Sequence, residues 1–266
     1  MTAVTGPNGQ LAARFAAAKA DGRAALVAYL TGYDPTRQAS LDRVLAACEA
    51  GVDVLELGVP FSDPTADGPT IQAAMVRALA SGASVAGVIA LAGEIRRRID
   101  VPVVLFGYAN PLLRFGPTLA ATAAAADVAG LLVVDLPPEH AGELRGAASE
   151  HGLDWVGLVA PTTTRPRRIA VLANTTGFVY AVSLTGVTGA ALDVDDTRLQ
   201  QNLGELRAAS GLPVAVGFGV RTPADVKALA RHADGVVVGS ALIEAGERGP
   251  AALAELVAAM RAATRR

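Results

Sequence analysis

Short apolar runs rich in β-branched residues recur eight times along this chain, and each is followed by a segment with a helical pattern. Runs that lack a regular polar alternation are typical of strands covered on both faces. Strands that alternate with helices form a parallel sheet, and eight such units favour closure into a (β/α)8 barrel, the TIM barrel, over an open sheet. The expected strands are residues 25–30, 52–57, 101–106, 131–134, 155–159, 178–182, 213–216 and 235–238.

The length of the chain fits one barrel without a second domain. Barrels routinely reach the 266 residues found here, and no linker or low-complexity stretch interrupts the alternation. We therefore expect residues 1–266 to form a single α/β domain, with an extra helix before the first strand and a short helix after the eighth. Thr222 and Asp225, with Pro223 between them, predict the start of another helix.

The composition argues against several classes of protein. A formal net charge of -2 gives no electrostatic footprint for nucleic acid. Alanine is a large share of the hydrophobic fraction of 52%, and no apolar run reaches the roughly 18 residues that a membrane-spanning helix needs. The first residues lack the pattern of a secretory signal, and the single cysteine, Cys48, cannot form an internal disulfide. We therefore expect a soluble protein of the cytoplasm.

Glycines crowd the segments that follow the last three expected strands. Gly186 and Gly189 follow the sixth strand, residues 217–219 read Gly-Phe-Gly after the seventh, and Gly239 and Ser240 follow the eighth. Each glycine alone is typical of a turn, but barrels commonly bind phosphate on backbone N–H groups of these loops. Ser240 can also open a short helix whose first amides face an anion. The three loops together predict a phosphate site, and residues 60–68 and 183–193 are long enough to act as lids.

The residue types available argue against two common aldolase mechanisms, the Schiff-base and the metal-dependent one. The only lysines, Lys19 and Lys227, fall in expected helices away from the carboxyl ends of the strands, which argues against a Schiff base. Cys48 lies on the apolar stripe of a helix and suits the core better than nucleophilic attack. The three histidines share no metal-ligand spacing; they are His140, His151 and His232. Carboxylates remain as the reacting groups.

Glu56 is the most unusual carboxylate, because it interrupts an apolar strand. Alternation places Glu56 on the same face as Val54 and Gly58, and an inward face would point it into the barrel. Burial would raise its pKa and suit it to proton transfer, although a structural carboxylate hydrogen-bonded to neighbours fits the local sequence equally well. Asp63 and Asp67 follow on the next loop, where one could form an Asx turn and the other could react.

A long stretch around these carboxylates resembles the signature of the tryptophan synthase alpha subunit family. Residues 55–72 read LELGVPFSDPTADGPTIQ, and the resemblance continues in the family's order over essentially the whole chain. The other matching motifs are LTGYDP at 30–35, GYANP at 107–111, VDLPPE at 134–139, APTTT at 160–164, FVYAVSLTGVTGA at 178–190, GFGV at 217–220 and GSAL at 239–242.

The resemblance implies a carbon–carbon lyase that cleaves indole-3-glycerol phosphate into indole and glyceraldehyde 3-phosphate in tryptophan biosynthesis. By resemblance, Glu56 moves a proton between the substrate hydroxyl and indole C3, Asp67 stabilises positive charge through the indole N–H, and Tyr180 lies beside the glycerol chain. Thr188 would belong to the lid over Asp67. The implied indole contacts are Tyr29, Ile71, Phe106 and Leu132. The implied phosphate contacts are Gly189, Gly219, Gly239 and Ser240, with Phe218 nearby.

The resemblance further implies no metal or cofactor in this chain and a pyridoxal-phosphate-bearing beta subunit as partner in an α2β2 complex. Pro64, Asn110 and Pro137 match the family's beta-facing loops. The chain departs from the family at Thr65-Ala66, where leucine is common, and after Gly189, where an arginine is often found. A free-standing lyase, a non-catalytic activator of a beta subunit and a generic phosphosugar isomerase are the alternatives.

Overall fold

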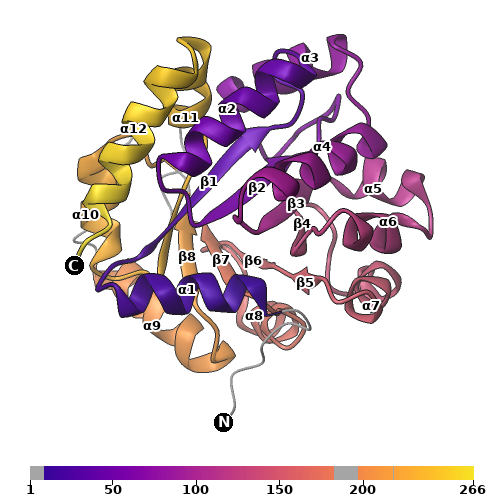
Figure 1. Cartoon of the computed structure of the whole chain (residues 1–266). Helices are drawn as coiled ribbons and strands as arrows, with labels where there is room; N and C mark the ends of the chain where they lie inside the picture. Colours follow the sequence, from indigo (N-terminus) through magenta and orange to yellow (C-terminus); the bar gives the residue numbers. More distant parts are fainter. Residues whose placement is uncertain (1–8, 183–196, 218) are drawn as a thin grey trace.

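The chain folds as a barrel of parallel strands surrounded by helices (Figure 1). The computed structural model describes residues 9–182, 197–217 and 219–266. Neighbouring strands pair in the order β5-β4-β3-β2-β1-β9-β8-β7-β6. The strands are β1 (Ala25–Thr31), β2 (Val54–Gly58), β3 (Val103–Gly107), β4 (Gly130–Val133), β5 (Asp154–Trp155), β6 (Gly157–Val159), β7 (Val179–Val182), β8 (Val214–Gly217) and β9 (Gly235–Val238).

Helices follow the strands and cover the outside of the barrel, as the sequence alternation predicts. The capping box expected at Thr222 and Asp225 is present at the start of α10, and the short helix after the last strand begins at Ser240. The helices are α1 (Gln10–Ala20), α2 (Arg37–Glu49), α3 (Pro69–Ala80), α4 (Val85–Arg98), α5 (Ala109–Phe115), α6 (Leu119–Ala125), α7 (Gly142–Glu150), α8 (Arg165–Leu172), α9 (Thr197–Ser210), α10 (Pro223–Ala230), α11 (Ser240–Glu247) and α12 (Pro250–Ala263).

The fifth expected strand is divided in two, and this division accounts for the ninth strand. β5 pairs with β4, whereas β6 pairs with β7, and Val156 joins the two halves. The Val156 N–H still donates to the Leu131 carbonyl at 2.9 Å. Strands of a closed barrel are staggered against each other, so one end of a strand can pair with one neighbour while the other end pairs with the next. The expected strand 155–159 is therefore present, but its first half pairs with β4 and its second half pairs with β7.

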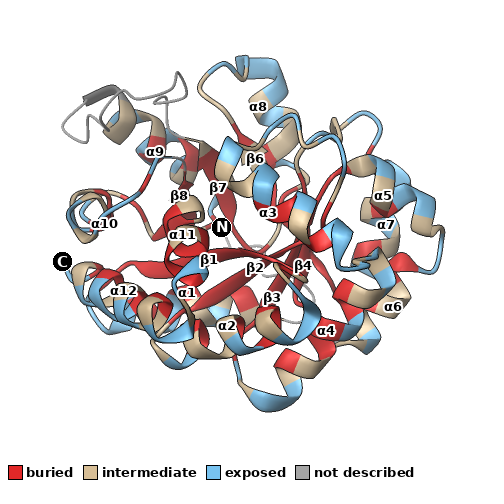
Figure 2. Ribbon diagram, turned by 90° about the horizontal axis from the view of Figure 1, so that it is seen from above, coloured by how far each residue is buried: buried red, intermediate tan, exposed pale blue. Residues whose placement is uncertain are grey.

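The strands are buried on both faces, as Figure 2 shows for the red centre of the molecule. Helix α1 covers the amino-terminal end of the barrel, where the Phe15 and Phe178 rings lie 5.2 Å apart. At the same end the Arg23 guanidinium binds the buried Asp53 carboxylate with contacts of 2.6 and 2.9 Å. The amino-terminal end is thus closed by packing and by a buried ion pair, which leaves the carboxyl ends of the strands for a site.

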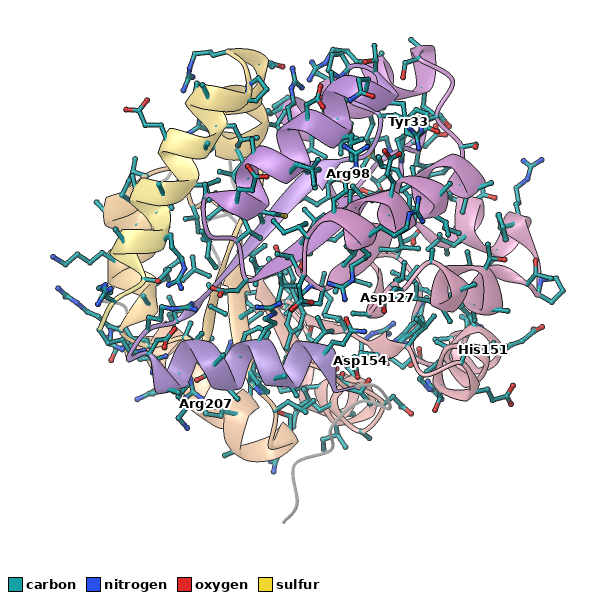
Figure 3. All side chains as sticks on the ribbon, viewed as in Figure 1. Tyr33, Arg98, Asp127, His151, Asp154 and Arg207 are labelled. Atoms are coloured by element: carbon teal, nitrogen blue, oxygen red, sulfur yellow. The ribbon has the colours of Figure 1, made fainter. Side chains whose placement is uncertain are left out.

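Ion pairs outside the barrel tie helices to neighbouring segments. Arg96 near the end of α4 binds Asp127 at 2.8 Å, and Arg207 of α9 binds Asp234 at 2.8 Å; Asp127 and Arg207 are labelled in Figure 3. Within the described residues no single helix has the length and apolar character to cross a bilayer, and only α3 and α4 taken together, bent by 100°, meet those criteria of length and composition.

Candidate active site

A cavity of about 160 Å³ opens at the carboxyl ends of the strands. One water needs only roughly 10–15 Å³, so the space admits a ligand rather than a single solvent molecule. Residues from β1, β2, β3, β7 and β9 and from the following loops line it. They are Tyr29, Glu56, Asp67, Gly68, Ile71, Phe106, Tyr180, Gly219, Val220, Arg221, Val237, Gly239 and Ser240.

A wider groove of about 610 Å³ lies elsewhere, beside α7 and α8. Its described lining contains only one ionisable side chain, Arg145, and none of the carboxylates with a shifted pKa. Catalytic sites are marked by convergent polar groups with perturbed pKa values, so the smaller cavity is the candidate active site despite its size.

Glu56 points from β2 into this cavity and is fully buried. Neither of its carboxylate oxygens has a hydrogen-bond partner among the described residues, which argues against the structural, hydrogen-bonded carboxylate left open by the sequence. Burial without a compensating partner disfavours the charged form and raises the pKa of Glu56 to about 8. The carboxyl group of Glu56 is therefore mostly protonated at neutral pH, and its pKa is close enough to neutral pH for it to release and regain a proton.

Asp67 enters the cavity from the loop between β2 and α3, held by a tyrosine. The Tyr108 hydroxyl donates to Asp67 Oδ2 at 2.6 Å and accepts from the Ala66 N–H at 3.0 Å. Burial raises the pKa of Asp67, and the hydrogen bond from Tyr108 lowers it. Asp63, the other acid of this loop, is exposed, accepts from the Ser62 hydroxyl and does not line the cavity. The structure thus distinguishes the two acids.

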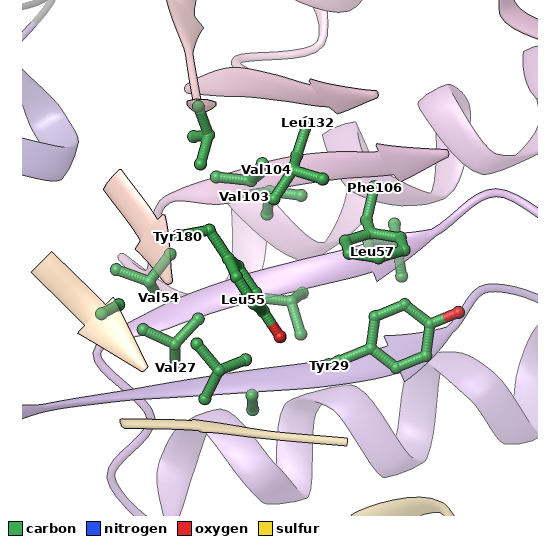
Figure 4. Close-up of a cluster of buried hydrophobic side chains, with 14 of the residues drawn as sticks. Val27, Tyr29, Val54, Leu55, Leu57, Val103, Val104, Phe106, Leu132 and Tyr180 are labelled. Atoms are coloured by element: carbon green, nitrogen blue, oxygen red, sulfur yellow. The ribbon is translucent and has the colours of Figure 1, made fainter. Parts of the chain in front are cut away.

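Two glycines make room for the aromatic rings of the cavity. A Cβ atom at Gly58 would collide with the Tyr29 ring, and one at Gly217 would collide with Tyr180. The Tyr29 ring therefore packs edge-on against Phe106, with centroids 5.0 Å apart. Burial raises the pKa of Tyr180, and the charges of Glu56 and Asp67 raise it further, so its hydroxyl stays protonated. Figure 4 shows the three rings extending into the barrel interior.

The glycine loops after β8 and β9 form one side of the cavity. Gly219 has φ of +75°, a conformation that glycine adopts without strain. Gly239 is the residue before α11, and Ser240 begins that helix, so the first N–H groups of α11 face the same space. Helix amino-termini attract anions, so this side of the cavity is where the phosphate site predicted from the sequence would lie.

Most of the expected site residues that the structure describes meet in this cavity. Leu132 is the exception: it is fully buried and pairs in register with Phe106, but it does not line the cavity and belongs to the buried hydrophobic cluster drawn in Figure 4. Three expected contacts, Thr188, Gly189 and Phe218, lie outside the described residues, as does the loop of residues 183–193.

The residues set aside on sequence grounds lie elsewhere. Cys48 is buried in α2, and burial raises the pKa of its thiol to about 12. Lys19 and Lys227 lie in α1 and α10 and do not line the cavity. The described chain contains no cluster of three or more histidine, cysteine or acidic residues that could hold a metal ion.

Two polar residues of the site were not predicted from the sequence: Tyr108, which binds Asp67 without lining the cavity, and Arg221, which lines it. Tyr108 directly follows β3, two positions after Phe106, and extending the strand alternation into the GYANP motif could have found it. Arg221 directly follows the GFGV motif, and its place next to a predicted phosphate loop is the signal that could have identified it.

The sequence also matches a known family over nearly its whole length. Residues 15–265 fit the family described as tryptophan synthase alpha chain. The alpha chain of Gluconacetobacter diazotrophicus is 49% identical over 263 residues, which cover 95% of this chain and 96% of that one. The alpha chain of Geobacter sulfurreducens is 45% identical over 260 residues, covering 96% and 98%. This chain belongs to the tryptophan synthase alpha chain family.

Solved structures agree with this assignment. Tryptophan synthase of Mycobacterium tuberculosis aligns with a TM-score of 0.90 at 39% identity, covering 96% of this chain and 98% of that chain. The alpha subunit from Legionella pneumophila aligns with a TM-score of 0.87 at 36% identity, covering 96% and 98%. The resemblance seen in the motifs and the expected barrel are therefore confirmed. The tryptophan synthase alpha chain is a lyase of indole-3-glycerol phosphate, and its family is not known to need a cofactor.

Proposed function

We propose that this chain cleaves indole-3-glycerol phosphate to indole and glyceraldehyde 3-phosphate by a retro-aldol reaction, as the alpha subunit of a tryptophan synthase. The observation that carries the proposal is the pair of carboxylates, Glu56 and Asp67, that open into one cavity beside a glycine-lined rim. Indole-3-glycerol phosphate has an apolar ring, a hydroxyl-bearing chain and a phosphate, and the cavity offers a matching environment for each.

Glu56 is the proposed proton carrier. Its neutral form donates a proton to indole C3, which makes the ring an electron sink for the breaking carbon–carbon bond. The resulting carboxylate then takes the proton from the hydroxyl of the side chain as that carbon becomes the aldehyde. The net transfer is one proton from hydroxyl to C3, and a pKa of about 8 for Glu56 suits both halves of the cycle near neutral pH.

Asp67 is the proposed partner of the ring nitrogen. Protonation at C3 places positive charge on the indole N–H, and a carboxylate beside it stabilises that charge. The hydrogen bond from Tyr108 favours the ionised form of Asp67 and fixes its orientation. Tyr180, kept protonated by burial, is suited to donate to the glycerol chain.

The remaining contacts follow from the chemistry of the lining. Tyr29, Ile71 and Phe106 supply apolar surface for the indole ring, and Leu132 lies beside Phe106 on the neighbouring strand. Phosphate would bind at the amides and hydroxyl of Gly219, Gly239 and Ser240. By resemblance to the family, Thr188, Gly189 and Phe218 would complete the lid and the phosphate site.

A beta subunit that carries pyridoxal phosphate is the proposed partner, in an α2β2 complex. Pro64, Asn110 and Pro137 lie on the loops or helix start that follow β2, β3 and β4. Hydrogen bonds cross-link these segments: Tyr108 binds Ala66 and Asp67, and the Ala109 N–H donates to Asp135 at 2.6 Å. Binding at this face would therefore reach Asp67 through direct contacts.

The proposal also covers the domain organisation, the location and the cofactor requirement of the chain. We infer that residues 1–266 act as one domain in the cytoplasm and need no metal or cofactor of their own, in keeping with the family and with the buried thiol of Cys48. Nothing observed favours a free-standing lyase.

Turnover of indole-3-glycerol phosphate by the purified chain, with and without a beta subunit, tests the proposal. We expect weak indole release by the chain alone and a marked increase on adding the partner. Glu56→Gln and Asp67→Asn should abolish cleavage while binding of inorganic phosphate survives. Retained turnover in Glu56→Gln would discard the proton-carrier assignment, and failure of any beta subunit to bind would discard the complex.

A further inference from the structure

One cation lines the cavity among the described residues, and no mechanistic step above uses it. Arg221 follows Gly219 by two positions and shares the cavity wall with Gly239 and Ser240. Its backbone is fixed, because the Arg221 N–H donates at 3.0 Å to Asp225, the acid of the α10 capping box. Its side chain is 61% exposed. Because its backbone is fixed and its long side chain is solvated, Arg221 can reorient its guanidinium without a movement of the loop.

The guanidinium of Arg221 is held at one nitrogen by a carboxylate of the neighbouring helix. Arg221 Nη2 lies 2.9 and 3.2 Å from the two carboxylate oxygens of Glu244. Glu244 is four residues beyond Ser240, so it projects from the same face of α11 as the first turn. The Thr70 hydroxyl, on α3, also donates to Glu244 at 3.1 Å. Among the described residues, the other guanidinium nitrogens of Arg221 have no hydrogen bond.

The electrostatics of the cavity leave a role for such a cation. Glu56 and Asp67 line the cavity and Glu244 lies beside it on Arg221, whereas Gly219 and Gly239 offer only the partial charges of backbone N–H groups. Among the described lining residues, a phosphate dianion bound there would meet no full positive charge other than that of Arg221. Guanidinium groups bind phosphate through paired, charge-assisted hydrogen bonds, and an exposed ion pair such as Arg221–Glu244 is weak and easily exchanged.

We propose that Arg221 is the side-chain arm of the phosphate subsite, which leaves Glu244 and donates to the substrate phosphate on binding. This inference rests on the proposed function for the identity of the substrate, but it concerns phosphate recognition alone. Glu244 competes with the phosphate for Arg221 and holds the arm at the rim of the cavity while the subsite is empty.

Inorganic phosphate is the probe, measured by calorimetry and as a competitive inhibitor of indole release. Arg221→Ala should weaken phosphate binding and raise KM about tenfold, the loss expected for one charge-assisted contact, with kcat and the binding of free indole unchanged. Arg221→Lys should recover part of the loss. Arg231→Ala, which removes an equal charge at the other end of α10, is the matched control and should change neither value.

A double-variant cycle separates direct contact from neutralisation of Glu244. Glu244→Gln alone should tighten phosphate binding. If Arg221 touches the phosphate, the double variant Arg221→Ala/Glu244→Gln binds it about tenfold more weakly than Glu244→Gln does. Equal binding by those two variants, or unchanged phosphate binding in Arg221→Ala, overturns the proposal.

The cycle also separates this inference from the proposed function. A wild-type chain that cleaves the substrate, alongside an Arg221→Ala variant with unchanged KM, would remove the role of Arg221 only. A wild-type chain that binds phosphate through Arg221 but never releases indole would remove the proposed reaction and support the arm.

Discussion

Replacing Glu56 with glutamine should stabilise the protein at neutral pH while it abolishes catalysis. In the unfolded chain Glu56 ionises near pH 4.5, whereas burial in the folded chain raises its pKa to about 8. Between these two pH values Glu56 ionises in the unfolded state but stays protonated in the folded state. Ionisation stabilises the unfolded state, so the free energy of unfolding falls as the pH rises. Glutamine resembles the neutral carboxyl in shape and does not titrate.

The size of the effect follows from the two pKa values. At pH 7 the pH exceeds the pKa of Glu56 in the unfolded chain, 4.5, by 2.5 units. At about 1.4 kcal/mol per unit, the free energy of unfolding of the variant should exceed that of the original protein by roughly 3 kcal/mol. The difference should be small below pH 4.5 and should level off near about 5 kcal/mol above pH 8. For a chain of this size, roughly 3 kcal/mol corresponds to an increase of about 6–12 °C in Tm.

Thermal and urea unfolding of both proteins, followed by circular dichroism from pH 4.5 to 9, measure this difference. Glu255→Gln changes the same residue type at an exposed position of α12 and should show no such pH dependence. A stability difference that stays constant across the pH range would falsify the assignment of Glu56 as a buried, neutral acid. Indole release in the same preparations should be undetectable for Glu56→Gln and unaffected for Glu255→Gln.

Three further predictions concern the groups around the cavity. Tyr108→Phe removes the hydrogen bond that lowers the pKa of Asp67, so the acidic limb of the kcat/KM profile should move to higher pH; an unmoved limb would show that Asp67 does not govern it. Gly217→Ala places a methyl group against the Tyr180 ring and should cost about 1–3 kcal/mol of stability, seen as a lower Tm, together with most of the activity. Cys48, whose pKa burial raises to about 12, should resist thiol reagents at pH 8 in the native protein and react once urea unfolds it, and rapid native labelling would contradict its burial.

The fold could be read from the sequence because its signals are local. Each buried strand carries its own apolar run, and the α10 capping box is spelled out by Thr222 and Asp225. The count of eight strand units followed directly, and so did the position of Gly219 after β8 and of Gly239 after β9. Only the division of the fifth strand at Val156 escaped, because the sequence of a strand does not reveal which neighbour each half will pair with.

The candidate site was decided by tertiary structure. The sequence by itself placed Glu56 on the same strand face as Val54 and Gly58 and placed Asp63 and Asp67 on one loop, but it left open which way that face points and whether Glu56 is structural or reactive. Packing decided between them, because the pKa of a carboxyl depends on the water and donors around it, and those come from residues distant in sequence. Tyr108 reaches Asp67 across 41 positions, and Arg221 meets Glu244 across 23. The sequence determined which residues lie at the carboxyl ends of the strands, and the closed barrel alone decided which of them meet, and in what state of protonation.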